Sequence, residues 1–306
     1  MSRLSVKIGH LTLNNPVLTA SGTFGYGDEF SSLINLNRLG GLVTKAVSLE
    51  PRPGNPFPRI AETSCGMLNS IGLANVGVKN FINEKLPSLK LLKTVVIVNI
   101  AGKTVDDFAQ VIAEIENAGG VSGYELNVSC PNVKEGGMAF SADPKITAAV
   151  TAEARTATDR CLIVKLSPNV TSISEIACAA EDAGADALSV INTIVGMAVD
   201  VNTRRPKLAT ITGGLSGPAI KSIAIAKVFE VVQSVDIPVI GLGGIMNFED
   251  ALEFLITGAT AIQVGTANFI DPQIAEKLVD DLERYCRYHN ITNINQIIGS
   301  LDLGGR

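Results

Sequence analysis

The chain has 306 residues, of which 46% are hydrophobic and 29 are glycine, while tryptophan is absent. This length suits a single α/β barrel, and the composition suits many short buried strands joined by tight turns. The 25 basic and 30 acidic residues give a formal net charge of −5 without a basic tract, which argues against nucleic-acid binding.

The first residues and the cysteines favour a cytoplasmic protein. Residues 1–5 lack the charged start and apolar core of a signal peptide, and apolar stretches such as 95–100 are too short to span a membrane. The five cysteines include no CxxC pair, so neither an iron–sulfur cluster nor a zinc or other metal site is expected in this chain. The two histidines, His10 and His289, lie near the ends, which predicts proton chemistry without histidine.

Short apolar runs recur along the chain. Residues 4–13 alternate apolar and polar side chains about a Gly9-His10 turn, which predicts a hairpin. Eight later runs have the length and composition of buried strands. These runs span residues 16–20, 42–44, 95–100, 124–126, 162–166, 187–191, 238–242 and 261–264.

Helix signals fall between most of these runs. Asp143 before a proline, Ser172 at the start of a Ser-x-x-Glu capping box, and Asn247 before two acidic residues mark helix starts. Glycines at positions 119, 184 and 258 mark helix ends. Eight strands alternating with helices predict a (β/α)₈ TIM barrel that forms one domain across residues 1–306.

Two connections are too long to be plain barrel loops. Residues 47–93 follow the second predicted strand and residues 193–220 follow the sixth, at the strand ends where barrel active sites form. Polar residues gather at the same ends: Ser21, Lys45, Asn99, Asn127, Lys165, Asn192 and Thr193. Burying two lysines is costly unless a polar or anionic ligand meets them, so this mouth is predicted to bind one. For any single residue, bonding to the local backbone is an equally good explanation.

Glycines follow the last two predicted strands. Gly243-Gly244 and Gly265-Thr266 lie where barrels commonly bind phosphate through backbone N–H groups, and Gly217 lies in the preceding insertion. Met246 stands where a dinucleotide fingerprint needs its third glycine, so no Rossmann-type NAD site is predicted.

Cys130 differs from the other cysteines because its loop is polar and lies at the predicted mouth. A thiolate close to a lysine can serve as a base or a nucleophile. The other four cysteines are interpreted as small buried apolar residues.

The run Asn127-Val128-Ser129-Cys130-Pro131-Asn132, followed by Gly136-Gly137, resembles the catalytic loop of the class 1 dihydroorotate dehydrogenases. Residues 67–73 resemble their substrate loop, and residues 191–193, residues 213–217 and the late glycines match in order. The likeness therefore covers essentially the whole chain. It implies oxidation of (S)-dihydroorotate to orotate in pyrimidine (UMP) biosynthesis, with one FMN per chain and no membrane segment.

The resemblance also implies roles for individual residues. Cys130 removes the C5 proton while hydride passes from C6 to flavin N5, Lys45 lies between flavin and substrate, and Lys165 stabilises negative charge on the reduced ring. The implied flavin contacts are Ser21, Lys45, Ala46, Asn99, Asn127, Lys165, Ile191, Gly217, Gly243, Gly244, Gly265 and Thr266. The implied substrate contacts are Lys45, Asn69, Ser70, Ile71, Gly72, Leu73, Asn127, Asn192 and Thr193.

Residues 60–69 resemble the NAD-linked type, class 1B, in which a separate electron-transfer subunit carries FAD and a [2Fe–2S] cluster. This type implies a homodimer core that binds two such subunits as a heterotetramer. A fumarate-linked class 1A enzyme and a barrel like the dihydropyrimidine dehydrogenase catalytic domain are alternatives. A non-redox isomerase or aldolase barrel that binds a phosphorylated metabolite would explain the glycines but not Cys130. A non-catalytic flavin-binding scaffold is a further alternative.

Overall fold

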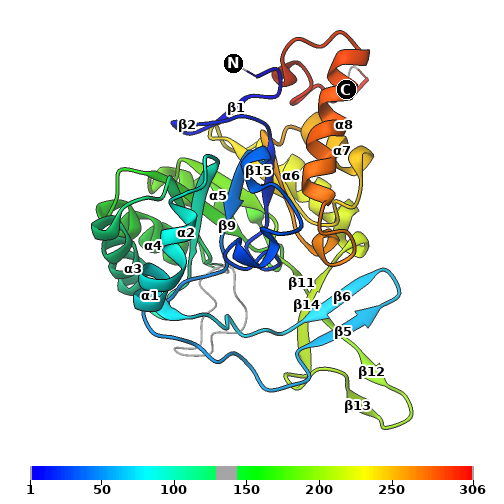
Figure 1. Ribbon diagram of the computed structural model, residues 1–306. Coiled ribbons are helices and arrows are strands. Elements are labelled where there is room, and N and C mark those ends of the chain that lie inside the picture. The colour runs from blue at the N-terminus through cyan, green and yellow to red at the C-terminus, as the bar shows by residue number, and fades with distance from the viewer. Residues whose placement is uncertain (1, 129–142, 305–306) are drawn as a thin grey trace.

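The computed structural model describes residues 2–128 and 143–304. Eight parallel strands close into a barrel in the spatial order β10-β15-β16-β3-β4-β7-β8-β9, and helices surround it (Figure 1). The barrel strands are β3 (Val17–Thr19), β4 (Gly41–Val43), β7 (Val95–Ile100), β8 (Gly123–Leu126), β9 (Cys161–Leu166), β10 (Ala187–Val190), β15 (Val239–Leu242) and β16 (Ala261–Val264). The predicted (β/α)₈ barrel is confirmed, and each predicted strand matches one of these to within two residues at either end.

The strands form because their side chains are buried on both faces, as a parallel sheet covered by helices requires. The covering helices are α1 (Gly77–Asn80), the π-helix η3 (Phe81–Lys85), α2 (Leu86–Leu89), α3 (Val105–Ala118), α4 (Pro144–Thr156), α5 (Ile173–Asp182), α6 (Lys221–Val232), α7 (Phe248–Thr257) and α8 (Ile274–Tyr288). Between β3 and β4 the chain forms the short 3₁₀ helices η1 (Asp28–Phe30) and η2 (Leu36–Arg38), in place of an α-helix.

The predicted helix starts are confirmed by their caps. The side chains of Asp143, Ser172 and Asn247 accept hydrogen bonds from the amides of the first turns of α4, α5 and α7. Glycines 119 and 258 follow directly after α3 and α7, and Gly184 lies one residue beyond the end cap of α5. Local chemistry therefore sets most helix boundaries.

The predicted N-terminal hairpin is confirmed as β1 (Val6–Ile8) paired with β2 (Leu11–Leu13). It lies at the N-terminal ends of the barrel strands, where the Cys161 thiol at the start of β9 donates to the Ile8 carbonyl at 3.6 Å. Ile8 and Leu13 are fully buried there. In Figure 1 the hairpin is at the end of the barrel opposite β5 and β6.

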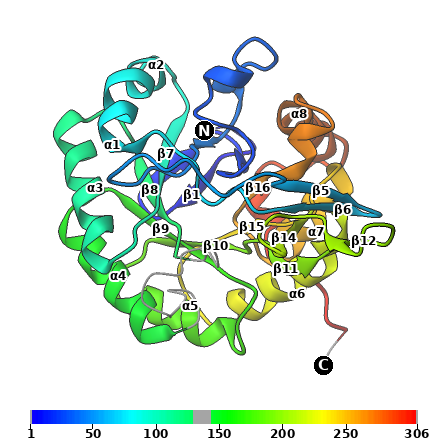
Figure 2. The same cartoon turned by 90° about the horizontal axis from the view of Figure 1, so that it is seen from below.

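The two insertions meet in one antiparallel sheet, which we call the insertion sheet. Its strand order is β11 (Ile194–Met197), β14 (Thr212–Ser216), β6 (Gly66–Asn69) and β5 (Ile60–Thr63). The pairing of β14 with β6 joins the second insertion to the first. Figure 2 shows this sheet lying across one side of the barrel end. A small ribbon, β12 (Val199–Asp200) with β13 (Arg205–Pro206), extends beyond it.

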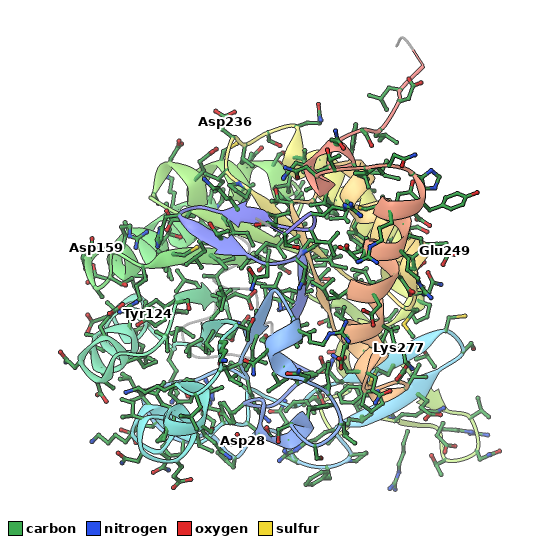
Figure 3. All side chains as sticks on the ribbon, turned by 45° about the horizontal axis from the view of Figure 1, so that its top comes forward. Asp28, Tyr124, Asp159, Asp236, Glu249 and Lys277 are labelled. Carbon is green, nitrogen blue, oxygen red and sulfur yellow. The ribbon has the colours of Figure 1, made fainter. Side chains whose placement is uncertain are left out.

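Charged side chains lie on the outside of the helical layer. Asp159, Asp236 and Glu249 are exposed and point outward around the rim of the molecule (Figure 3). Three 3₁₀ helices complete the fold: η4 (Pro218–Ile220), η5 (Thr266–Phe269) and η6 (Ile294–Gln296). Within residues 2–128 and 143–304, no helix is both long and apolar enough to cross a membrane.

Candidate active site

A cavity of about 470 Å³ opens at the C-terminal ends of the barrel strands, between the strands and the insertion sheet. Lys45 follows β4, Asn127 follows β8 and Lys165 is the penultimate residue of β9, so the barrel itself directs their side chains to this end. The insertion sheet adds Met67 and Asn69 as the opposite wall. Segments distant in the sequence thus meet around one space.

Most of the predicted contact residues line this cavity. The predicted flavin contacts that line it are Ser21, Lys45, Ala46, Asn127, Lys165, Ile191, Gly217, Gly243, Gly244, Gly265 and Thr266. The predicted substrate contacts that line it are Lys45, Asn69, Ile71, Gly72, Leu73, Asn127, Asn192 and Thr193.

Two predicted site residues do not line the cavity, and a third lies outside the described residues. Asn99 is fully buried beneath the cavity, where its amide donates to the Glu125 carboxylate at 2.7 Å. Ser70 is also fully buried, and its backbone pairs with Arg59 and Asn55 behind the cavity wall. Cys130, the predicted base, lies outside the described residues, as does the Gly136-Gly137 pair.

Two lysines bring positive charge to the cavity. The backbone amide of Lys45 donates to the Gly25 carbonyl at 2.7 Å, while its ammonium has no hydrogen-bond or ion-pair partner among the residues that the structure describes. Lys165 is only 5% exposed, and its Nζ lies 3.7 Å from Glu125 Oε1. Lys165 is compensated by Glu125, so it is the half-buried Lys45 ammonium, without a partner among the described residues, that favours a ligand with polar or anionic groups.

The glycines after β15 allow that loop to pack closely against the start of α6. Gly244 has a φ of +75°, and a Cβ there would lie 2.9 Å from both the Gly217 carbonyl oxygen and the Lys221 amide. The Lys221 ammonium is paired with Asp250 at 2.7 Å, and Asp250 also accepts from the Met246 amide at 2.8 Å. These bonds hold the loop after β15 against the start of α6. Backbone N–H groups at such a helix start suit a phosphate.

The wall formed by the insertions is held by amide side chains. Asn69 Nδ2 donates to the Gly214 carbonyl at 3.3 Å, which ties the end of β6 to β14. Asn192 Oδ1 accepts from the Thr193 amide at 2.7 Å, and Asn169 donates to the Thr193 carbonyl at 2.9 Å. These bonds fix the backbone next to the cavity.

Burial governs the other ionisable groups near the barrel. It raises the pKa of Tyr26 to about 12, and this phenol donates to the Ala46 carbonyl beside the cavity at 3.4 Å. Burial likewise raises the pKa of Cys161 to about 12, at the opposite end of the barrel. Both groups stay neutral at physiological pH, so neither provides a base.

The sequence prediction missed Glu125, Ser189 and Gln263, each of which is the penultimate residue of its barrel strand, as Lys165 is. Glu125 and Ser189 are fully buried and Gln263 is 1% exposed, and the three side chains are hydrogen-bonded together. A polar residue inside an otherwise apolar strand was the available signal.

A matching family profile and two similar proteins are all described as dihydroorotate dehydrogenases. The profile of a family described as "Dihydroorotate dehydrogenase" matches residues 3–286. A protein of Trichlorobacter lovleyi named "Dihydroorotate dehydrogenase B (NAD(+)), catalytic subunit" is 54% identical over 299 residues, covering 98% of each chain. A protein of Bacteroides thetaiotaomicron with the same name is 51% identical over 303 residues, covering 99% of this chain and 100% of its own.

A solved structure supports the fold. The crystal structure of DHODH from Eimeria tenella, in complex with ferulenol, superposes with a TM-score of 0.80. The alignment covers 97% of this chain and 88% of that chain at 24% sequence identity. At this identity the likeness concerns the barrel and its arrangement of elements.

Proposed function

Because this chain belongs to the dihydroorotate dehydrogenase family, we propose that it is the catalytic subunit of an NAD⁺-linked enzyme that oxidises (S)-dihydroorotate to orotate. This is the oxidation step of de novo pyrimidine biosynthesis. The observation that carries the proposal is that Lys45, Lys165 and the glycines after β15 and β16 line one cavity. A non-redox barrel explains the glycines but not Cys130 or the asparagine-rich lining formed by Asn69, Asn127 and Asn192.

The residues present fit FMN. Gly217, Gly243 and Gly244 have positive φ values, which lets their loops pack closely around the start of α6, where a phosphate would be held by N–H groups. Lys165 would face the ring system and stabilise negative charge on it. When bound, FMN supplies the hydride acceptor of the reaction.

The substrate would lie against the cavity wall that the insertion sheet forms. Asn69, Asn127 and Asn192 offer amide groups that match the amide edges of dihydroorotate, and the ammonium of Lys45 would attract its carboxylate. Cys130 is the proposed base, which removes the C5 proton as the hydride leaves C6. The thiolate suits this task because the cavity lining contains no histidine among the described residues.

We further propose a complex in which the chain forms a homodimer and each copy binds one electron-transfer subunit with FAD and a [2Fe–2S] cluster. The exposed apolar side chains Ile60, Val195 and Met197 on the insertion sheet would be covered in such an assembly. Cys65, which was interpreted as a buried residue, is exposed instead. The cytoplasm is the proposed compartment, because its reducing conditions keep such a cysteine as a thiol.

The test is anaerobic reduction of the purified protein. We expect a yellow protein whose flavin absorbance is bleached by dihydroorotate, and whose colour returns with NAD⁺ only after the electron-transfer subunit is added. Cys130→Ala should retain the flavin and slow bleaching at neutral pH by about 100-fold or more, the loss typical for a positioned base.

Three outcomes would contradict the proposal. A protein that stays colourless and inactive with added FMN would remove the flavin assignment. Rapid turnover with fumarate by the chain alone would favour the class 1A alternative. Faster bleaching by dihydrouracil than by dihydroorotate would favour an enzyme like dihydropyrimidine dehydrogenase.

A further inference from the structure

A carboxylate lies at the centre of the barrel, one layer below the cavity. Glu125 on β8 is fully buried, and side chains from four other strands converge on it. Its Oε1 accepts from Asn99 Nδ2 at 2.7 Å and lies 3.7 Å from Lys165 Nζ. Its Oε2 accepts from Ser189 Oγ at 2.9 Å and from Gln263 Nε2 at 2.6 Å.

This arrangement determines which way the two amides point. An ionised carboxylate only accepts hydrogen bonds, so the NH₂ groups of Asn99 and Gln263 must face Glu125 and their oxygens must point away from it. Asn99 Oδ1 and Gln263 Oε1 are both buried and have no partner within the part of the chain that the structure describes. Leaving a buried acceptor without a partner is costly, which indicates that a ligand completes the network.

Gln263 differs from Asn99 in its access to the ligand. Gln263 and Lys165 both line the cavity, whereas Asn99 and Ser189 are not among its lining residues. The cavity floor therefore presents an ammonium donor and an amide acceptor, both held by the same carboxylate. Such a pair complements a ring edge on which a carbonyl oxygen is adjacent to an N–H group.

We propose that Gln263 is a ligand-contacting residue whose Oε1 accepts a hydrogen bond from the ring N–H of the flavin, and that Glu125 is the positioning residue that orients it. The inference rests on the proposed function, since it takes FMN as the ligand. The oxidised isoalloxazine ring has one N–H group, at N3. Glu125 acts without touching the ligand, by excluding the flipped orientation in which Gln263 would present NH₂ to the cavity.

The competing explanation is a polar cluster that only fills the barrel. Barrel interiors are usually filled by branched apolar side chains, which would pack here without buried charges. If the cluster only fills the barrel, the loss of any one hydrogen bond to Glu125 should change flavin binding by a similar amount. Ser189 donates to the same oxygen as Gln263 but does not line the cavity, so it provides the matched control.

The experiment measures flavin binding by the apoprotein, through quenching of flavin fluorescence, with FMN and with N3-methyl-FMN. Wild-type protein should bind FMN about tenfold more tightly than the methylated form, since one buried hydrogen bond is lost. Gln263→Met keeps the length of the side chain and should bind both flavins about equally, with FMN weakened about tenfold. Glu125→Gln should reduce the preference, because the Gln263 amide becomes free to flip, while Ser189→Ala should keep the wild-type ratio.

An unchanged preference for FMN in Gln263→Met would overturn the inference and leave the proposed function intact. Loss of the preference in Ser189→Ala as well would also overturn it, in favour of the filling role. If neither flavin binds wild-type protein, the proposed function fails and this inference fails with it. Circular dichroism of each apoprotein identifies a variant that has not folded, and Gln263→Met alone decides the question if Glu125→Gln is such a variant.

Discussion

At the scale of single residues, Lys165 and Glu125 form an ion pair in which the lysine is 5% exposed and the glutamate is fully buried. Lys165→Met would leave the carboxylate buried with neutral donors only. Because an uncompensated buried charge is costly, we expect the free energy of unfolding of the apoprotein to fall by about 3 kcal/mol. Urea unfolding followed by circular dichroism measures the change.

The double variant Lys165→Met with Glu125→Gln tests the cause of that loss. Removing both charges should recover more than half of the stability, since the desolvated carboxylate is gone. A double variant less stable than the single one would show that the hydrogen bonds to Glu125, and not its charge, dominate.

At the scale of elements, α3 begins with a complete capping box, which the sequence reading did not identify. Thr104 accepts from the Asp107 amide at 3.2 Å, and Asp107 accepts from the Thr104 and Lys103 amides. Burial raises the pKa of Asp107, but the bonds from Thr104 and Lys103 outweigh it and hold the pKa below its ordinary value. We expect Thr104→Ala to cost about 1 kcal/mol at pH 7, measured as a lower Tm.

The pH dependence follows from the direction of that shift. A carboxyl whose folded pKa is depressed adds stability above its unfolded pKa, near 4, and loses it as the pH falls through the lower folded value. The Tm difference between wild type and Thr104→Ala should therefore shrink as the pH falls below about 4. Asn293→Ala, which removes the cap of η6, is the control, because that first turn contains no acidic residue, and its cost should change little over this range. A difference for Thr104→Ala that stays constant down to pH 2 would contradict the role of Asp107.

At the scale of the whole molecule, the cavity wall formed by the insertion sheet depends on the contact between two distant insertions. A Cβ at Gly214 in β14 would lie 2.1 Å from Thr193 Oγ1, so Gly214→Ala must displace Thr193 or the strand. We expect the KM for dihydroorotate to rise about tenfold or more, since small displacements of positioning groups are costly. Steady-state kinetics of the assembled complex measures this, and the Kd for FMN should change little.

Gly196→Ala provides the comparison in the same sheet. Among the described residues, its Cβ would approach only Leu68 Cδ2, at 3.0 Å, and Leu215 Cβ, at 3.6 Å, and Gly196 is not among the residues that line the cavity. The KM of this variant should stay within about twofold of wild type, because its contacts are with apolar side chains away from the site. Equal effects of the two substitutions would indicate general damage to the sheet.

The sequence was sufficient for features that depend on neighbouring residues. Buried strands such as 95–100 and caps such as Asp143 and Asn247 were predicted where they occur, because periodicity and capping act within a few residues. The cavity residues at strand ends were predicted for a similar reason, since parallel strands of a barrel all end at one face.

Features that depend on distant pairing were not predicted. Nothing local to residues 60–69 or 212–216 indicates that the two segments share a sheet, because strand pairing is selected by packing between them. Nor does the sequence indicate that Asn99 turns toward Glu125 while Lys165 reaches the cavity. The direction of a side chain at a strand end depends on the neighbours that surround it in space.

The pairing of β6 with β14 also constrains how this enzyme could be re-engineered. Asn69 and Gly214 are 145 residues apart in the chain, yet they share a backbone register and a hydrogen bond. A chimera that takes only one insertion from a relative would pair a foreign strand with a native one where β6 meets β14, in the insertion sheet that forms the cavity wall. To transfer the substrate preference of a relative, both insertions should therefore be exchanged together, although they are encoded by two separate segments of the gene.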